Sequence, residues 1–227
     1  MKIPPAPHSW TLSPREAIAL QRRLAGKVVQ RALPRDTRLV AGIDCAFSRD
    51  GEYCLAVVVL WDVESESVVE EHRARRKLRF PYIPGLLTFR EGPAALAALR
   101  KLHRPPDVLM FDGQGIAHPR RFGIASHIGL ITGIPSVGCA KSRLTGEHRQ
   151  VGERRGSHAQ LQDDGEVIGV VLRTRDGVRP VFVSPGHLSD LNSARALTLR
   201  CATRYRLPEP TRLADRRVAV YKCELTK

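Results

Sequence analysis

An α/β fold built on a mixed sheet is predicted by the order of the strand-like and helix-like segments. Three strand-like runs, at residues 39–47, 54–62 and 67–78, follow an N-terminal helix, and helices and strands alternate after them. The turn Arg49-Asp50-Gly51 joins the first two runs, so an antiparallel meander is expected. The length of 227 residues and the hydrophobic share of 42% fit a single domain, residues 1–227, with one core.

The chain is expected to begin with a helix at about residues 13–32. Ser13 and Glu16 have the spacing of a capping box, and Pro14 occupies the first helical position, where a missing N–H is tolerated. The core of the domain is then expected at about residues 38–222.

A stiff loop and a second helix are expected after the meander. The segment Phe80-Pro81-Tyr82-Ile83-Pro84-Gly85 has two prolines and a glycine, which exclude regular structure. A helix over 88–102 follows, and Thr88 and Glu91 suggest a second capping box. The polar stretch 145–165 is predicted to be a long loop. The other predicted elements are strands at 107–111, 134–140, 167–173 and 178–183 and helices at 121–132, 189–205 and 209–222.

The net charge favours a polyanionic partner. Lys and Arg outnumber Asp and Glu by 37 to 23, giving a formal charge of +14 and a pI near 10.3. Nucleic acid is the first candidate partner. The alternative is that an arginine-rich composition reflects genome bias, and charge alone does not decide between the two.

Cysteine usage and hydropathy indicate a cytoplasmic protein. The five cysteines are scattered and never spaced as C-x-x-C, which argues against a disulfide framework or a zinc site. The longest purely apolar stretch, Leu55 to Trp61, is too short to cross a bilayer. We therefore expect no membrane association.

Three carboxylates stand in unusually apolar surroundings. Asp44 interrupts the first strand, Glu91 lies in the first turn of an apolar helix, and Asp112 ends the strand at 107–111. A charged carboxylate in such surroundings is costly unless it is paired or bound to a cation, and hard cations such as Mg²⁺ prefer oxygen ligands. Each residue also has a structural alternative. Asp112 could start a turn before Gly113, Glu91 could complete the capping box, and Asp44 could form a salt bridge.

A series of short motifs, in order along the chain from about residue 13 to 220, resembles the endonuclease V family. Each motif alone is weak, but the ordered set is specific. The motifs are Val40-Ala41-Gly42-Ile43-Asp44, Phe80-Pro81-Tyr82-Ile83-Pro84-Gly85, Phe89-Arg90-Glu91, Phe111-Asp112-Gly113-Gln114-Gly115, His118-Pro119-Arg120, Gly123-Ile124-Ala125-Ser126-His127, Ala140-Lys141-Ser142 and Val183-Ser184-Pro185-Gly186-His187.

The resemblance implies a ribonuclease H-like fold and a DNA repair activity that requires Mg²⁺ or Mn²⁺. The implied reaction is hydrolysis of the second phosphodiester bond 3′ to deoxyinosine, leaving 3′-hydroxyl and 5′-phosphate ends. Asp44, Glu91 and Asp112 fall on the family's metal-binding carboxylates, and Asp215 matches a fourth position on the last helix. An intrahelical ion pair is the alternative for Asp215. Two metal ions held there would activate a water and stabilise the leaving oxygen.

Two further residues are implied to act in catalysis. Lys141 follows a predicted strand and would offset negative charge developing on the phosphate, although a surface lysine is the alternative. His187 follows another predicted strand and would orient the phosphate or assist proton transfer. The seven other histidines weaken that signal.

Lesion recognition is implied for a second group of residues. Inosine differs from adenine at one exocyclic position, so its base has to leave the stack and be read in a fitted pocket. Tyr82, on a loop stiffened by Pro84, resembles the family's wedge, and covering of the core is the alternative. Three glycines would let the backbone approach the base: Gly85, Gly113 and Gly115. Three side chains would form walls of the pocket, with core packing as the alternative: Ile116, His118 and Ile124.

Three rival functions remain open from the sequence. Animal members of the family act mainly on RNA, so an inosine-specific ribonuclease fits as well. A nucleic-acid-binding protein without catalysis would fit the charge, although all four carboxylate positions are acidic. A ribonuclease H or junction resolvase would lack the wedge and Gly-Gln-Gly sequences. We expect a monomer whose partner is nucleic acid, chiefly DNA containing deoxyinosine.

Overall fold

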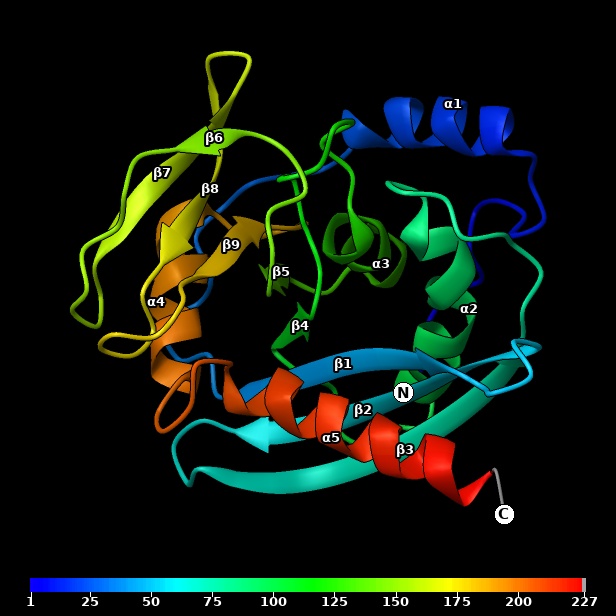
Figure 1. Ribbon diagram of the computed structural model, residues 1–227. Coiled ribbons are helices and arrows are strands. Elements are labelled where there is room, and N and C mark those ends of the chain that lie inside the picture. Colours follow the sequence, from blue (N-terminus) through cyan, green and yellow to red (C-terminus); the bar gives the residue numbers. More distant parts are fainter. Residues whose placement is uncertain (226–227) are drawn as a thin grey trace.

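A single nine-stranded sheet with helices on both faces dominates the described chain, residues 1–225 of a computed structural model (Figure 1). The elements, in chain order, are α1 (Pro14–Ala25), β1 (Leu39–Phe47), β2 (Tyr53–Asp62), β3 (Ser67–Lys77), α2 (Leu87–Leu99), β4 (Val108–Phe111), α3 (Ile124–Thr132), β5 (Ser136–Ala140), β6 (Glu147–His148), β7 (His158–Asp163), β8 (Glu166–Leu172), β9 (Val181–Pro185), α4 (Leu191–Cys201) and α5 (Glu209–Glu224).

The strand order of the sheet is β3-β2-β1-β4-β5-β9-β8-β7-β6. Strands β1, β4 and β5 run parallel, and all the other pairs are antiparallel. The predicted meander of β1, β2 and β3 and the predicted mixed sheet are therefore confirmed. The fold is ribonuclease H-like, as the family resemblance implied.

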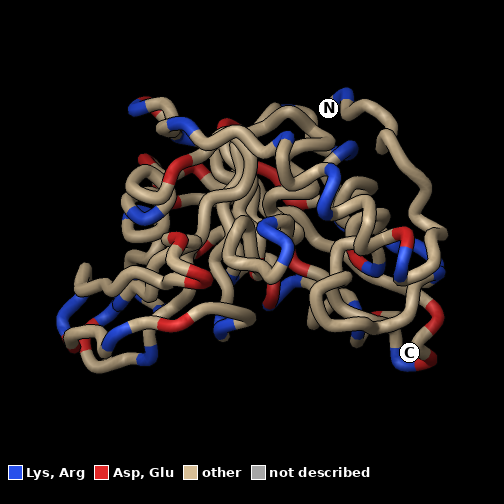
Figure 2. Tube along the Cα trace, turned by 90° about the horizontal axis from the view of Figure 1, so that it is seen from above, with Lys and Arg blue, Asp and Glu red and all other residues tan. Residues whose placement is uncertain are grey.

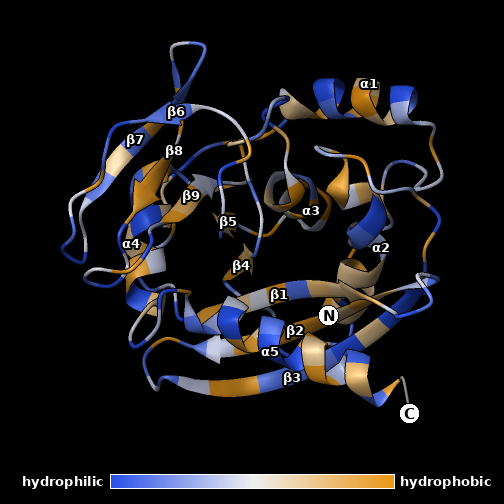
Figure 3. Ribbon diagram, in the orientation of Figure 1, coloured by the Kyte–Doolittle hydropathy of each residue, from blue (hydrophilic) through white to orange (hydrophobic). Residues whose placement is uncertain are grey.

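Two layers of helices bury the two faces of the sheet. Ala41 and Ile43 of β1 pack with α2 and α3, whereas Val40 packs in a separate cluster with α4. On β2, Leu55 and Val57 face α5. Successive side chains of a strand point to opposite faces, so both faces of β1 and β2 are apolar where helices cover them. Figure 3 shows these strands as largely hydrophobic and the outer surfaces of the helices as mixed.

Gly42 sets how closely α5 approaches β1. A Cβ atom at this position would lie 2.1 Å from the carbonyl carbon of Pro210, near the start of α5. No residue with a side chain fits there, which explains a glycine in the middle of a buried strand. Asp44 lies two residues further on the same face, so the close crossing brings α5 toward it.

Two predicted helices begin or end at different residues in the structure. Helix α1 ends at Ala25, so the expectation of helix to residue 32 was wrong. The chain beyond it instead bonds to another loop, because Val29 donates to His187 Nδ1 and accepts from the Leu188 amide. Helix α3 starts at Ile124, not residue 121, because Arg121 has a φ of 53°, which no right-handed helix can contain.

The capping box predicted for α2 is absent. The N-cap residue is Leu86, no side chain caps the helix, and the last helical residue is Leu99. Glu91 therefore does not serve as a cap.

The remaining differences are in the C-terminal half. The stretch 145–165, predicted to be a loop, contains β6 and β7, and α4 is shorter than expected because Asp190 caps it by accepting from the Ser193 amide. No helix within residues 1–225 combines the length and apolar character that a membrane crossing requires.

Candidate functional site

Three aspartates from three elements converge beside the carboxyl end of the inner strand β4. Asp44 lies on β1, Asp112 follows β4 directly, and Asp215 lies on α5. Their nearest carboxylate oxygens all lie within 4.8 Å of one another. The parallel register that pairs Ile43 with Phe111 brings the first two together, because each aspartate follows a paired residue.

Glu91 joins these aspartates from the first turns of α2. Burial and the negative charges of Asp44 and Asp112 raise the pKa of Glu91 to about 8. Burial and the charge of Asp112 likewise raise the pKa of Asp44 to about 7, and burial raises that of Asp112. The four predicted carboxylates therefore form one cluster whose negative charge is only partly compensated.

The contacts of these carboxylates do not match their structural alternatives. Asp44 has no ion pair among residues 1–225, and its one hydrogen bond is accepted from the Cys45 amide at 2.9 Å. Asp112 and Asp215 both bind Lys141, so Asp215 is not paired within its own helix.

Lys141 is the cation of the cluster. Its Nζ lies 2.5 Å from Asp112 Oδ2 and 2.9 Å from Asp215 Oδ1. Burial acts to lower the pKa of Lys141, but the hydrogen bonds to Asp112 and Asp215 outweigh burial and raise it. Lys141 is therefore fully protonated and bridges two of the carboxylates.

Two side chains that the sequence analysis missed hold the loop of Lys141. The Arg206 guanidinium donates to the Lys141 carbonyl at 2.8 Å and also to the carbonyls of Arg179 and Pro180. Gln114 Nε2 donates to the carbonyl of Ser142 at 3.0 Å. The Gly-Gln-Gly motif could have pointed to Gln114, but nothing in the sequence marks Arg206, because its partners lie far away in the chain.

A cleft of about 380 Å³ opens beside Asp112. Its walls come from the segment before α2 and the start of α2, the segment between β4 and α3, and the loop after β5. It contains most of the residues that the sequence analysis assigned to a base pocket, together with Gln114 and Leu144. The predicted residues that line it are Tyr82, Pro84, Gly85, Gly113, His118 and Ile124.

The loop that carries Tyr82 is anchored at Gly85. Its carbonyl accepts from Gln21 Nε2 at 3.0 Å, from His118 Nε2 at 2.9 Å and from Arg120 Nη2 at 2.7 Å. Gly85 has a φ of 78°, a conformation that favours glycine. The Tyr82 side chain, in contrast, is 68% exposed, so it does not cover the core.

His118 both lines the cleft and holds its wall. Burial lowers the pKa of His118 to about 4, so the ring is neutral at neutral pH. Nε2 faces the Gly85 carbonyl, and Nδ1 accepts from the Arg120 amide at 3.1 Å. These contacts fix the tautomer with the proton on Nε2.

Three of the predicted residues lie outside this arrangement. Gly115 packs against the Pro185 carbonyl, where a Cβ atom would lie 2.0 Å away, and the buried Ile116 donates its amide to the same carbonyl. His187 is bonded to Ser136, at the opposite end of β5 from Lys141. The antiparallel pairing of β5 with β9 causes this separation, so the structure does not bring His187 to the carboxylates.

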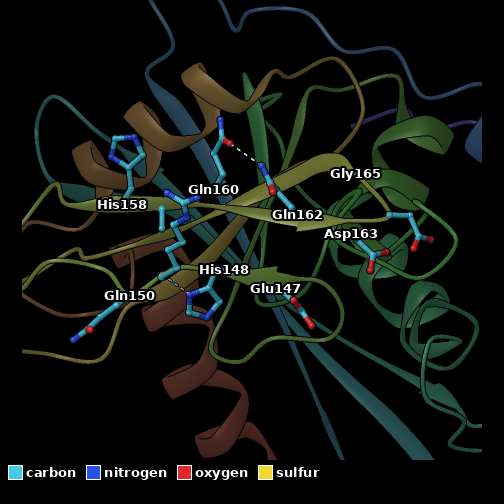
Figure 4. Close-up of a pocket in the computed structure, with 11 residues that line it drawn as sticks. Glu147, His148, Gln150, His158, Gln160, Gln162, Asp163 and Gly165 are labelled. Carbon is cyan, nitrogen blue, oxygen red and sulfur yellow. Dashed lines mark hydrogen bonds between the residues drawn. The ribbon is translucent and has the colours of Figure 1, made fainter.

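A larger cavity, of about 930 Å³, lies along β6 and β7. In Figure 4 its labelled side chains, among them His148, His158 and Gln162, spread along the strands without converging on one point. The basic residues do not gather in one segment either, since Figure 2 shows Lys and Arg along the whole trace. The carboxylate cluster and its cleft are therefore the better candidate site.

Comparisons with known proteins identify the family of this chain. The family model described as Endonuclease V matches residues 22–216. The endonuclease V of Methanothrix thermoacetophila is 54% identical over 207 residues, which are 91% of each chain. The crystal structure of endonuclease V from Streptomyces avermitilis has a TM-score of 0.92 and 43% identity, covering 97% of this chain and 98% of that one.

The structure of a protein–DNA complex has a similar fold. The Ciona intestinalis endonuclease V, crystallised with a 23-mer DNA containing an inosine followed by a ribo-adenosine, has a TM-score of 0.81 and 23% identity. It covers 94% of this chain and 100% of its own.

Proposed function

Because the chain belongs to the endonuclease V family, a family of nucleases, we propose that it is a DNA repair endonuclease that recognises deoxyinosine. It hydrolyses the second phosphodiester bond 3′ to the lesion and leaves 3′-hydroxyl and 5′-phosphate ends. The observation that carries the proposal is a carboxylate cluster beside a cleft, with an exposed aromatic residue at the cleft's edge. A nuclease specific for an extruded base needs all three features.

The residues present fit a divalent cation, Mg²⁺ first and Mn²⁺ as a substitute. Asp44, Asp112 and Asp215 offer oxygen ligands close together, and burial together with the charges of neighbouring carboxylates raises the pKa values of Asp44 and Glu91. Asp44, Glu91, Asp112 and Asp215 would hold the metal. When bound, it would supply a Lewis acid for the phosphate and an activated water.

Lys141 has the second catalytic role in this proposal. Its ammonium already lies between Asp112 and Asp215, so a phosphate brought to the cluster meets a protonated donor. Such a donor offsets the negative charge that develops on the phosphate oxygens. His187 is left out of the proposed catalytic set because it lies at the other end of β5.

The cleft is proposed to take the extruded base. Its volume lies in the range of about 300–1,000 Å³ that is common for small-molecule sites. Gly85, Gly113, His118 and Ile124 line it, whereas Gly115 and Ile116 pack against Pro185 and do not. Tyr82 would fill the gap that the base leaves, since most of its ring is free of the protein.

A cleavage assay with mapped products tests the proposal. A duplex with one deoxyinosine is incubated with the protein and Mg²⁺, beside the same duplex with deoxyadenosine and an RNA of equal sequence with inosine. We expect one Mg²⁺-dependent nick in the deoxyinosine strand, at the second phosphodiester bond 3′ to the lesion. Equal cutting of the deoxyadenosine duplex would refute lesion recognition. Preference for the RNA would identify an inosine-specific ribonuclease instead.

A further inference from the structure

A second group of possible metal ligands lies beside the edge strand β3 and consists of Glu70, His72 and His103. Glu70 and His72 are two residues apart on β3, so both point to the same face of the sheet. His103 lies in the connection between α2 and β4. The ligand atoms of all three residues lie within 4.8 Å of one another.

Both imidazoles converge on one oxygen of Glu70. His72 Nε2 lies 3.1 Å and His103 Nδ1 lies 3.2 Å from Glu70 Oε2. A tetrahedral ion with bonds of about 2.0–2.1 Å separates its ligand atoms by roughly 3.3 Å. The two distances are therefore close to those that one such ion would impose, with little movement of the side chains.

The carboxylate also has the supports that a ligand requires. Its Oε1 accepts from the Arg104 amide at 2.9 Å, and Oε2 accepts from the His103 amide at 2.9 Å. These bonds fix the orientation of the carboxylate, as outer hydrogen bonds do in metal sites. Within residues 1–225, only imidazoles form ion pairs with Glu70, so no guanidinium or ammonium competes for it.

Solvent reaches the group from one side. The Glu70 and His72 side chains are 12% and 22% exposed, whereas the His103 side chain is 82% exposed. Two ligands are therefore largely buried in the fold, and the third approaches from the solvent side. This leaves one coordination position open to water.

The group is separate from the carboxylate cluster. His72 pairs with Val58, which packs toward α2, whereas Asp44 pairs with Val57, which packs toward α5. Directly paired residues point to the same face of a sheet, so His72 and Asp44 lie on opposite faces. No residue can therefore serve as a ligand in both groups.

We propose that Glu70, His72 and His103 bind one divalent ion of the late first transition series, such as Zn²⁺. Imidazole nitrogen suits these ions, whereas Mg²⁺ prefers oxygen and suits the carboxylate cluster. The ion replaces the hydrogen bonds of the two rings to Oε2, and the bonds from the backbone amides remain. It joins the connection after α2 to β3, so its role is to stabilise that connection and not to take part in cleavage.

Calorimetry with Zn²⁺ alone tests the proposal in the full-length Asp44→Asn/Asp112→Asn protein, in which the catalytic cluster is disabled. We expect one Zn²⁺ bound per chain, together with a rise in melting temperature. His103→Ala and Glu70→Gln should each weaken binding by about tenfold or more. His103→Ala is the safer variant because that side chain is largely exposed.

His148→Ala is the matched control, because His148 is an exposed histidine without a carboxylate partner within residues 1–225. It should leave Zn²⁺ binding unchanged. The absence of Zn²⁺ binding would overturn the proposal, as would equal binding by the His103→Ala, Glu70→Gln and parent proteins. All proteins are compared at a temperature where their metal-free forms are folded.

Discussion

Two aspartates on neighbouring strands, Asp62 at the end of β2 and Asp44 on β1, have opposite environments. Asp62 Oδ2 lies 2.6 Å and 2.8 Å from two nitrogens of Arg38, and Oδ1 accepts from the Glu64 amide at 2.9 Å. The bonds from Arg38, opposed by burial, hold the pKa of Asp62 down at about 2. Asp44 accepts one backbone bond and faces other carboxylates, and its pKa is raised to about 7.

The difference separates a carboxylate that is paired within the fold from carboxylates that are only partly paired, as the proposed metal ligands would be. Asp62 has its donors within the protein, so its charge is satisfied when the chain folds. The charges of Asp44, Glu91 and Asp112 repel one another, and Lys141 compensates only part of them. Such uncompensated charge marks candidate functional sites.

Asp112→Asn should reduce nicking of a deoxyinosine duplex by at least about 100-fold while binding of that duplex persists. The amide keeps the shape of the side chain but loses the charge that a metal ligand needs, and even outer-sphere changes at metal sites cost about 10–100-fold. Single-turnover cleavage and a gel-shift assay in Ca²⁺ measure the two quantities. Nicking within tenfold of wild type would remove Asp112 from the catalytic set.

Tyr82→Ala should weaken cleavage of duplex deoxyinosine by roughly tenfold to 100-fold, and that of single-stranded deoxyinosine much less. Stacking on an aromatic ring contributes about 1–3 kcal/mol, and the vacated stack exists mainly in duplex DNA. The duplex to single-strand activity ratio is measured for this variant and for Tyr205→Ala, another exposed tyrosine, as control. An unchanged ratio in Tyr82→Ala would refute the wedge.

The metal-free protein should lose stability as pH rises from about 4 to about 8. The pKa values of Asp44 and Glu91, about 7 and about 8, lie above their ordinary values of 3.8 and 4.5. The folded state therefore binds more protons than the unfolded state in this window, and stability falls with rising pH. Melting temperatures in EDTA measure the slope. The Asp44→Asn/Glu91→Gln variant should flatten the slope, and a slope equal to that of wild type would contradict the raised pKa values of these two carboxyls, which burial and the neighbouring carboxylates cause.

Asp62→Asn should have the smallest effect on activity, within about twofold of wild type, and should lower the melting temperature by a few degrees. Its pKa is depressed, so its contribution is present above the ordinary value of 3.8 and is lost as pH falls toward 2. Wild type and variant should therefore converge in stability near pH 2. A large loss of cleavage at unchanged stability would mean that Asp62, like Asp44, contributes to cleavage and not only to stability.

Much of the fold was predictable because its signals are local. The bounds of β1 were predicted at Leu39 and Phe47, since an apolar run between turn residues identifies a strand without knowledge of its partners. The capping-box spacing of Ser13 and Glu16 correctly predicted the start of α1. Thr88 and Glu91 have the same spacing but form no capping box. Spacing alone did not reveal that Glu91 would instead face two aspartates.

The sequence by itself determined which residues were chemically unusual, because a carboxylate inside an apolar run is costly wherever the run packs. Asp44 and Asp112 stood out for that reason, and the ordered motifs indicated the family. Only the tertiary structure decided which of the predicted residues meet. The antiparallel pairing of β5 and β9 carries His187 away from Lys141, and Arg206 reaches the Lys141 carbonyl from 65 positions along the chain. Strand direction and long-range contacts have no local signature, since they depend on the pairing of distant segments.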